Sequence, residues 1–363
     1  MSKIDFEKID KIQVHFIVGS GRSGTTLLVH IFNEHKECMA VPEIKHLVFF
    51  YNKYRNVKIV TEKLIEDYRK YFWLIKSYKK LNCTLDQNDL LINLLSPGDE
   101  ISYERLTKLM YLSFIEDKNK IDNIKFIVDK NPYYSFHMNI INDVFPRSSI
   151  LMLQRDPRAF VSSNRQSQIP VKNVLSVSYY ALAWNLFHNI KPAFKDALKF
   201  RFKVMNYEDM VSGKETYVKI ICEFFNMPFD SGMFDFHLSV LKKIEKDKLT
   251  INQYERAKKR LSDLSSPINP ESVNSWKINL SIQEIKKVDF LCGKKMIEST
   301  YTPLYNQFSL LQIIFFFISA IPANCRLICF KILDSPQLNH FLFIQQLKKE
   351  KRYLKRNQNV FTN

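Results

Sequence analysis

Short apolar runs alternate along the chain with longer segments of helical periodicity. Apolar runs typical of strands occur at residues 12–18, 39–41, 125–128, 149–154 and 202–206. Between them, apolar positions recurring about every 3.6 residues predict helices near 24–36, 136–144, 157–167 and 176–198, and a mostly helical stretch at 46–120. Strands alternating with helices indicate a parallel sheet covered on both faces. The sequence therefore predicts an α/β fold, a three-layer sandwich with a helical insertion at about 46–120.

Glycine is concentrated at one place in the chain. Of only seven glycines, Gly19, Gly21 and Gly24 directly follow the first predicted strand. Glycine lets the backbone turn its N–H groups toward a ligand, and the N-terminus of the next helix adds a partial positive charge. A strand, a glycine-rich turn and a helix in this order are typical of a phosphate-binding site. The ligand should therefore carry a phosphate.

Two phosphate-binding patterns fit this loop in part. A nucleoside-triphosphate P-loop has a lysine where Thr25 stands, which disfavours kinase or ATPase chemistry. The Gly-x-Gly-x-x-Gly pattern of an NAD(P)- or FAD-dependent oxidoreductase is present, with Glu43 about where the ribose-binding acid should lie. This alternative gives no function to the guanidinium and three hydroxyls that the loop places beside one anion, on Arg22, Ser23, Thr25 and Thr26.

The loop resembles that of the sulfotransferases that use 3′-phosphoadenosine 5′-phosphosulfate (PAPS). In that family an Arg-Ser-Gly-Thr-Thr segment after the first strand holds the 5′-phosphosulfate, and residues 22–26 match it position by position. After the strand at 149–154, Arg155 and Ser163 keep the spacing of the arginine and serine that bind the 3′-phosphate. The resemblance implies a P-loop-like loop that holds one end of PAPS through Arg22, Ser23, Gly24, Thr25 and Thr26, while Arg155 and Ser163 hold the other.

The chemistry of the second motif agrees with this role. Arg155, at the carboxyl end of a strand, offers a planar fork of donors suited to a phosphate dianion. Pro157 is suited to open the next helix, because its fixed φ fits the first turn and its missing N–H is not needed there. Ser163 would then lie about two turns into that helix. The alternative for Arg155 is a surface arginine paired with Asp156.

The resemblance also suggests catalytic groups. Glu43 lies at the interval from Arg22 at which tyrosylprotein sulfotransferases carry their catalytic glutamate, so we expect it to be the general base. Lys130 matches the lysine of a Lys-x-Pro segment near the sulfuryl group of related enzymes, and with Arg22 it should stabilise developing negative charge. His46 is an alternative base and Lys45 an alternative cation. The donor itself requires no metal.

Two later segments resemble the family less closely. Tyr207 begins a Tyr-Glu-Asp run after the last predicted strand, and in some sulfotransferases this tyrosine touches the nucleotide. We therefore predict that Tyr207 contacts PAPS, although a buried structural tyrosine would look the same. Ser281 and Glu284 have the spacing of a capping box, which predicts a helix that begins there and continues through Ile297.

Composition limits the remaining classes. A net charge of +17 suits polyanionic ligands such as PAPS, an acidic saccharide or an anionic membrane surface, and we predict no nucleic-acid partner. Six cysteines without Cys-x-x-Cys pairs imply neither a zinc site nor a disulfide framework. The N-terminus carries no apolar signal region. We therefore expect a cytoplasmic enzyme, either free in the cytoplasm or associated with a membrane.

The acceptor is less defined than the donor. The stretch 50–120 is rich in aromatic and basic residues and has no phosphate-type loop. If this insertion covers the carboxyl edge of the sheet, its rings and cations lie beside the acceptor; otherwise its aromatics form core and its lysines are solvated. The absence of a secretory signal favours a saccharide or glycolipid hydroxyl over a protein tyrosine.

The C-terminal part differs from the rest. Residues 302–325 contain no charge, and Lys348 to Arg356 carries six basic residues against one acidic residue. Gln312 and Pro322 interrupt the apolar stretch, which is short for a membrane span. Residues 306–363 therefore form either a helix buried against a catalytic domain at 1–305 or a membrane-peripheral attachment. We predict a PAPS-dependent sulfotransferase; the non-enzymatic alternative is a nucleotide-binding, membrane-peripheral scaffold without turnover.

Overall fold

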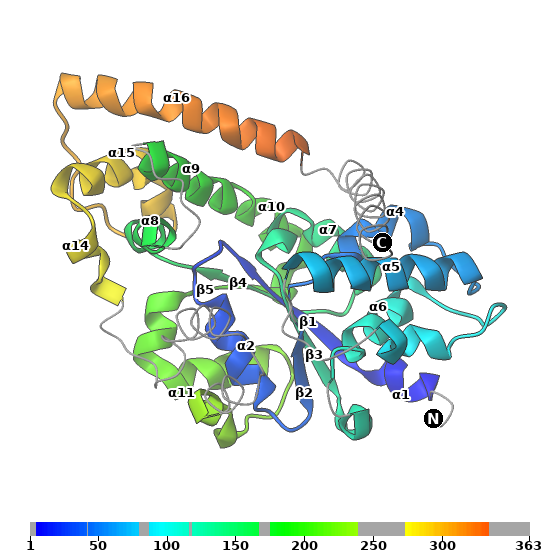
Figure 1. The fold of residues 1–363 in the computed structure, drawn as a ribbon. Helices are drawn as coiled ribbons and strands as arrows, with labels where there is room; N and C mark the ends of the chain where they lie inside the picture. The colour runs from blue at the N-terminus through cyan, green and yellow to red at the C-terminus, as the bar shows by residue number, and fades with distance from the viewer. Residues whose placement is uncertain are drawn as a thin grey trace, which may run out of the picture.

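The fold is built on a five-stranded parallel sheet (Figure 1). This computed structural model describes residues 5–41, 43–79, 87–115, 118–166, 175–238 and 273–333. The strands lie in the order β2-β3-β1-β4-β5, and every neighbouring pair is parallel. Their bounds are β1 Gln13–Gly19, β2 Cys38–Val41, β3 Phe126–Lys130, β4 Ile150–Gln154 and β5 Phe202–Asn206. All carboxyl ends therefore meet at one edge of the sheet.

Helices fill the connections between the strands, so the predicted α/β fold is confirmed. The 3₁₀ helix that bears on the site is η4, Pro132–Phe136. The α-helices of the described residues are α1 Phe6–Lys11, α2 Thr25–Asn33, α3 His46–Phe49, α4 Tyr51–Tyr54, α5 Glu62–Lys79, α6 Tyr103–Leu112, α7 Met138–Val144, α8 Pro157–Gln166, α9 Leu175–Asn189, α10 Lys191–Leu198, α11 Tyr207–Phe224, α14 Trp276–Asn279, α15 Ile282–Glu298 and α16 Leu310–Leu333.

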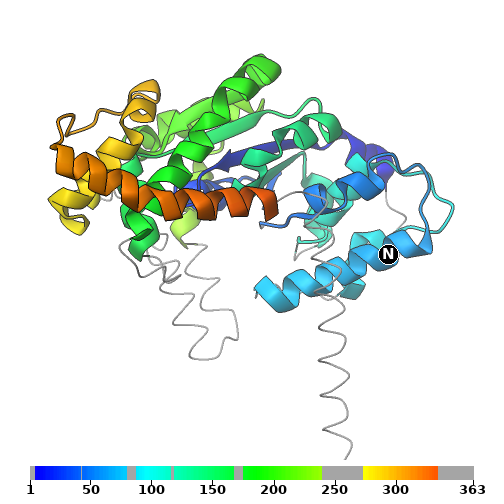
Figure 2. The same cartoon turned by 90° about the horizontal axis from the view of Figure 1, so that it is seen from above.

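The strand side chains divide between two hydrophobic layers. On β1, Phe16 and Val18 join the core beneath α1, α5, α6 and α7, whereas Ile17 joins the core beneath α2 and α11. This alternation follows from the two-residue period of a strand. Figures 1 and 2 show helices on both sides of the sheet, which is the expected three-layer arrangement.

A third hydrophobic core lies between the helices that pack around α8. Helices α8, α9, α14 and α15 share a core around Trp184, and α16 packs along α9 on the outside of the molecule (Figure 1). The indole Nε1 of Trp184 donates a hydrogen bond to the carbonyl of Arg155 at 2.8 Å. This core therefore fixes the backbone where β4 ends.

Two local details refine the sequence predictions. The helix expected at 176–198 is divided at Ile190, because Pro192 lies in the first turn of α10 and would disrupt a continuous helix. The capping box is confirmed: the Ser281 hydroxyl accepts from the Glu284 N–H, and the Glu284 side chain accepts from the Ser281 N–H.

A buried carboxyl links the insertion to the sheet. The Tyr111 hydroxyl on α6 donates to Asp129 on β3 at 2.5 Å, and the His46 ring packs against Tyr111 with centroids 4.8 Å apart. Burial raises the pKa of Asp129 from its ordinary value of 3.8 to about 8, against smaller lowering effects of Tyr111 and Lys130. Asp129 therefore keeps its proton near neutral pH.

Asp129→Asn should change how stability depends on pH. The folded protein keeps a proton on Asp129 that the unfolded chain loses above about pH 4, so the free energy of unfolding should fall as pH rises from 4 to 8. One proton contributes a slope of about 1 kcal/mol per pH unit. Urea unfolding from pH 4 to 8 should give a flatter profile for Asp129→Asn than for the wild type. Parallel profiles would contradict a protonated Asp129.

Candidate active site

The predicted site residues gather at the carboxyl edge of the sheet. Each strand end is followed by one of them, or in β3 ends with one: residues 22–26 after β1, Glu43 after β2, Lys130 in β3, Arg155 after β4 and Tyr207 after β5. Ligands of open α/β sheets bind at this edge. The topology therefore brings together residues up to 185 positions apart, from Arg22 to Tyr207.

The loop after β1 is tight and depends on glycine. Gly19 has φ +133°, and a Cβ there would lie 2.2 Å from the carbonyl oxygen of Leu153 on β4. Gly24 has φ +86°, a left-handed conformation that side chains disfavour. Inside the turn, the hydroxyls of Ser20 and Ser23 lie 2.5 Å apart. The first and third glycines of the motif are thus required by close approach and by backbone conformation.

Helix α2 begins directly behind this loop. Its N-cap is Gly24, which has no side chain to cap the first turn. Thr25 is buried and Thr26 is exposed, so two hydroxyls and the helix N-terminus lie at one place. The partial positive charge of a helix N-terminus favours an anion.

The two phosphate-binding motifs are in direct contact. Arg22 Nε donates to the Ser163 hydroxyl on α8 at 3.0 Å, and Arg155 Nη1 donates to the carbonyl of Arg22 at 3.1 Å. The Arg155 guanidinium lies 4.4 Å from the centroid of the Tyr207 ring, and this ring covers Gly24 so closely that a Cβ on Gly24 would meet it at 2.2 Å. One nucleotide can therefore reach both motifs.

Asp156, the partner of Arg155 in the alternative interpretation, forms an ion pair with Arg158. Its carboxylate accepts two hydrogen bonds from the Arg158 side chain, from Nε at 2.9 Å and from Nη2 at 2.6 Å. Arg158 also packs over the Trp276 ring, 4.3 Å from its centroid. Pro157 opens α8 as predicted, and Ser163 lies about two turns into it.

Glu43 and Lys130 form an ion pair between the ends of β2 and β3. The Lys130 side chain is 7% exposed and that of Glu43 is 49% exposed, so the cation lies beneath the carboxylate. The segment after Glu43 is anchored at the Ile44 carbonyl, which accepts from Asn131 Nδ2 at 2.8 Å and from the Tyr134 hydroxyl at 2.9 Å. Glu43 is thereby held at an accessible position with its cation fixed.

The two alternative groups lie in different surroundings. The Lys45 ammonium sits 3.6 Å from the centroid of the Tyr133 ring at the edge of a pocket. His46 is fully buried, and burial lowers its pKa from 6.5 to about 3. It is also absent from the pocket wall. Its place in the core makes His46 a poor general base, and Lys45 stays a second cation of the site.

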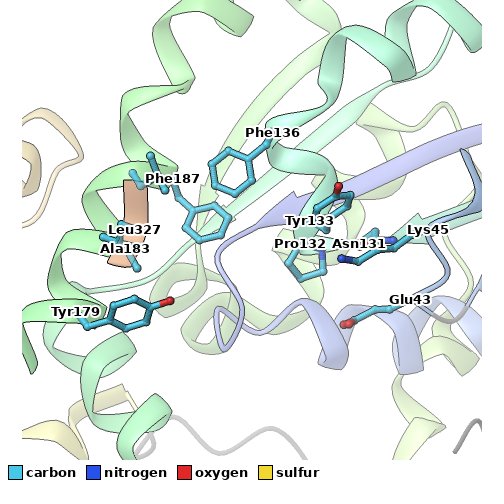
Figure 3. A pocket seen from close by; sticks show the side chains of 11 residues that line it. Glu43, Lys45, Asn131, Pro132, Tyr133, Phe136, Tyr179, Ala183, Phe187 and Leu327 are labelled. Carbon is cyan, nitrogen blue, oxygen red and sulfur yellow. The ribbon is translucent and has the colours of Figure 1, made fainter. Parts of the chain in front are cut away.

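A pocket of about 330 Å³ opens beside the ion pair. Glu43, Lys45 and Asn131 form its polar end. The opposite wall comes from α9 through Tyr179, Ala183, Leu186 and Phe187, and from α16 through Leu327. Figure 3 shows the polar group and the α9 side chains facing each other across the opening. The pocket is thus polar at the end near Glu43 and apolar at the end near α9 and α16.

No described residue of the helical insertion lines this pocket, contrary to one of the two expectations. Its tyrosines at 54, 68, 71, 103 and 111 are buried, which fits the alternative of an aromatic core. The Tyr103 hydroxyl donates to the carbonyls of His46 and Leu47, and the Tyr71 hydroxyl accepts from the Lys45 N–H at 2.7 Å. The insertion therefore positions the segment after Glu43.

Sequence reasoning missed the pocket wall on α9 and α16. Tyr179, Ala183 and Leu327 belong to no motif, and each lies at an ordinary apolar position of a helix. The sequence signal nearest to them is the uncharged stretch at 302–325, which predicts packing or membrane attachment and not a pocket wall. Within the described residues, no group of three His, Cys, Asp or Glu side chains could hold a metal ion.

Three solved structures to which this chain is similar are sulfotransferases. The sulfotransferase domain from the curacin biosynthetic pathway is 17% identical, with 80% of this chain and 98% of that chain covered and a TM-score of 0.49. The sulfotransferase domain of the Synechococcus PCC 7002 olefin synthase is 15% identical, with 85% and 99% covered and a TM-score of 0.46. Sulfotransferase STF9 from Mycobacterium avium is 13% identical, with 80% and 78% covered and a TM-score of 0.37.

No curated protein matches the sequence. A model of the sulfotransferase family matches residues 15–231, which include the loop after β1, Glu43, Lys130 and both members of the Arg155–Ser163 pair. This match spans more than half of the chain, and the chain therefore belongs to the sulfotransferase family.

Proposed function

We propose that this enzyme transfers a sulfuryl group from PAPS to a hydroxyl of a saccharide or glycolipid acceptor. The observation that carries the proposal is the contact between the two phosphate-binding motifs, from Arg22 to Ser163 and from Arg155 to the Arg22 carbonyl. A nucleotide with phosphates at both its 3′ and 5′ positions needs two such anion sites close together. The oxidoreductase alternative and the scaffold without turnover do not agree with membership of the sulfotransferase family.

The residues present fit PAPS. The open backbone at Gly21, where a Cβ would meet nothing within 4 Å, leaves room for a phosphate against the loop. The α2 N-terminus and the side chains of Ser23, Thr25 and Thr26 would hold the 5′ end, and Arg155 with Ser163 would hold the 3′-phosphate. Tyr207 would support this end through its contact with the Arg155 guanidinium.

The ion pair supplies the groups for proton transfer and charge stabilisation. Glu43 would accept the acceptor's hydroxyl proton as the acceptor oxygen bonds to sulfur and the sulfur–oxygen bond to the phosphate breaks. Lys130 and Arg22 would stabilise the negative charge left on the departing phosphate oxygen. PAPS supplies the sulfuryl group, and the protein mainly positions the two reactants in line.

The pocket supports the acceptor part of the proposal. Its polar end contains the proposed base, so an acceptor hydroxyl that enters the pocket meets Glu43. Asn131 and Lys45 offer further donors at this end for the hydroxyls of a sugar. The cytoplasmic location expected from the sequence stays a prediction.

Arg155→Ala should weaken the binding of adenosine 3′,5′-bisphosphate selectively. Loss of a charge-assisted hydrogen bond costs about 1.5–3 kcal/mol, so affinity should fall about 10- to 100-fold. Affinity for adenosine 5′-phosphosulfate, which has no 3′-phosphate, should change much less. Isothermal titration calorimetry with both ligands measures the difference.

The matched control for this variant is Arg165→Ala. Arg165 lies on the same helix as Ser163 but pairs with Glu284 at the surface. It should leave the affinity for both ligands unchanged. Equal losses of both ligands in Arg155→Ala would contradict the 3′-phosphate site.

Glu43→Gln should abolish turnover while the nucleotide still binds. Removing a general base lowers kcat by about 100- to 10,000-fold. Transfer from labelled PAPS to a pool of saccharide and glycolipid acceptors measures turnover, and calorimetry with the bisphosphate measures binding. Glu37→Gln is the control, because Glu37 pairs with Lys125 away from the pocket. Turnover retained in Glu43→Gln would assign the base to another group.

A further inference from the structure

Helix α16 has one packed face and one exposed apolar face. Its packed face consists of Phe316, Ala320, Ala323 and Leu327, all of which are buried. Its exposed apolar face, called here the α16 face, consists of Leu310, Leu311, Ile314, Phe315, Phe317, Ile318, Ile321 and Ile328. At 100° per residue the α16 face covers an arc of roughly 160° opposite the packed face.

The size of this face is unusual for a helix of a soluble core. Leu310–Cys329 is long and apolar enough to cross a membrane, with a mean hydropathy of 1.7, yet only 22% of its most apolar window is buried. From 310 to 321 no polar side chain interrupts the face. Contiguous exposed apolar surface of this kind marks an interaction site.

Helix α16 lies against the domain along its length. The hydroxyls of Ser178 on α9 and Ser319 on α16 are 3.1 Å apart, and the Phe290 ring on α15 contacts Phe316 at 5.5 Å between centroids. Figure 1 shows α16 as the outermost helix, over α9. A helix packed side-on in this way presents its free face to a surface parallel to its axis, which is the geometry of an interfacial helix.

Basic groups accompany the α16 face. Arg326 is exposed on α16 and lies 5.6 Å over the ring of Tyr179. Lys286 of α15 lies 5.1 Å over the ring of Tyr305, just before α16. The sequence beyond α16 adds six basic residues against one acidic residue at 348–356. Apolar side chains flanked by cations match a bilayer with anionic headgroups.

The acceptor pocket reaches α16 on its packed side, next to Arg326. Leu327 on α16 and Tyr179 on α9 line the apolar end of the pocket, and Arg326 connects the two helices over Tyr179. The polar end with Glu43 lies across the opening (Figure 3). An amphiphile that enters beside α16 would therefore place its apolar part along α9 and α16. Its hydroxyl would then lie beside Glu43.

We propose that the α16 face docks on an anionic lipid bilayer and that the acceptor is a lipid-linked glycoside taken from that bilayer. The docking proposal does not depend on the proposed function, whereas the choice of acceptor rests on it. A second copy of the chain is a less suitable occupant, because a face of large aliphatic and aromatic side chains flanked by basic groups is complementary to lipid and not to another basic surface.

The docking test uses the full chain and vesicles of phosphatidylcholine with phosphatidylserine. The wild type should sediment with these vesicles, and less so at high salt. Ile318→Glu and Phe317→Glu should each lower the vesicle-bound fraction at least tenfold. Phe200→Glu is the matched control, because Phe200 is 85% exposed but lies on a 3₁₀ turn before β5, outside α16. Unchanged affinity for adenosine 3′,5′-bisphosphate would show that the variants are folded.

Three outcomes overturn the docking surface. A wild type that stays in solution with these vesicles, or glutamate variants that sediment as it does, would exclude the lipid bilayer. A wild-type dimer that becomes a monomer in Ile318→Glu, measured by light scattering without vesicles, would assign the face to a second copy.

The acceptor test compares one sugar in two forms, methyl glucoside in solution and a glucosyl diacylglycerol in the same vesicles. The wild type should transfer sulfuryl groups at least tenfold faster to the vesicle-borne glucoside, and Ile318→Glu should lose this preference while its rate with methyl glucoside is unchanged. Equal rates with both forms would overturn the lipid-linked acceptor. Bisphosphate binding without transfer to either form would contradict the proposed glycosyl acceptor, whereas a failure to bind the bisphosphate would contradict the proposed function itself.

Discussion

The arrangement of the site depends on the junction between the loop after β1 and the start of α8. Arg22 reaches Ser163 across 141 residues of sequence, and Arg155 reaches the Arg22 carbonyl across 133. Two guanidinium groups held in one site repel each other, and a polyanion bound between the motifs, as proposed, would relieve this repulsion. The Tyr207 ring, placed over Gly24 and against Arg155, closes the same junction from β5. Three strand ends therefore support one anion site.

Much of the fold could be predicted because its signals are local. A buried parallel strand reads as an apolar run, so β1 and β4 were recognisable from composition alone, and the glycines at 19 and 24 marked the turn. Strand order was not predictable in this way, because the pairing of β1 with both β3 and β4 depends on contacts distant in sequence. The boundary between α9 and α10 was not predicted, because it is set by Pro192 and the apolar periodicity continues across it.

Sequence reasoning located the candidate site residues that follow strand ends and missed the pocket residues whose position depends on helix packing. Arg22, Arg155 and Glu43 follow strands, and the topology of a parallel sheet places such residues at one edge. Tyr179 and Leu327 reach the pocket only because α16 packs on α9, and nothing in an apolar helical position distinguishes a pocket wall from a core. The aromatic insertion was ambiguous for the same reason, since the sequence alone does not show that Tyr71 and Tyr103 bind backbone groups inside the protein.

Hydrogen bonds made by tyrosine hydroxyls also explain how Glu43, the proposed base, can be held firmly and still be accessible. A carboxyl buried as deeply as Asp129 has its pKa raised to about 8, keeps its proton and cannot accept another. Glu43 avoids such burial, because Tyr71, Tyr103 and Tyr134 bind the backbone of the segment that follows it and leave its side chain half exposed above Lys130. Hydrogen bonds to the backbone hold the segment after Glu43 in place, and the Lys130 ammonium balances the charge of the Glu43 carboxylate. The insertion thus helps to hold Glu43, the proposed base, while α9 and α16 shape the space in front of it.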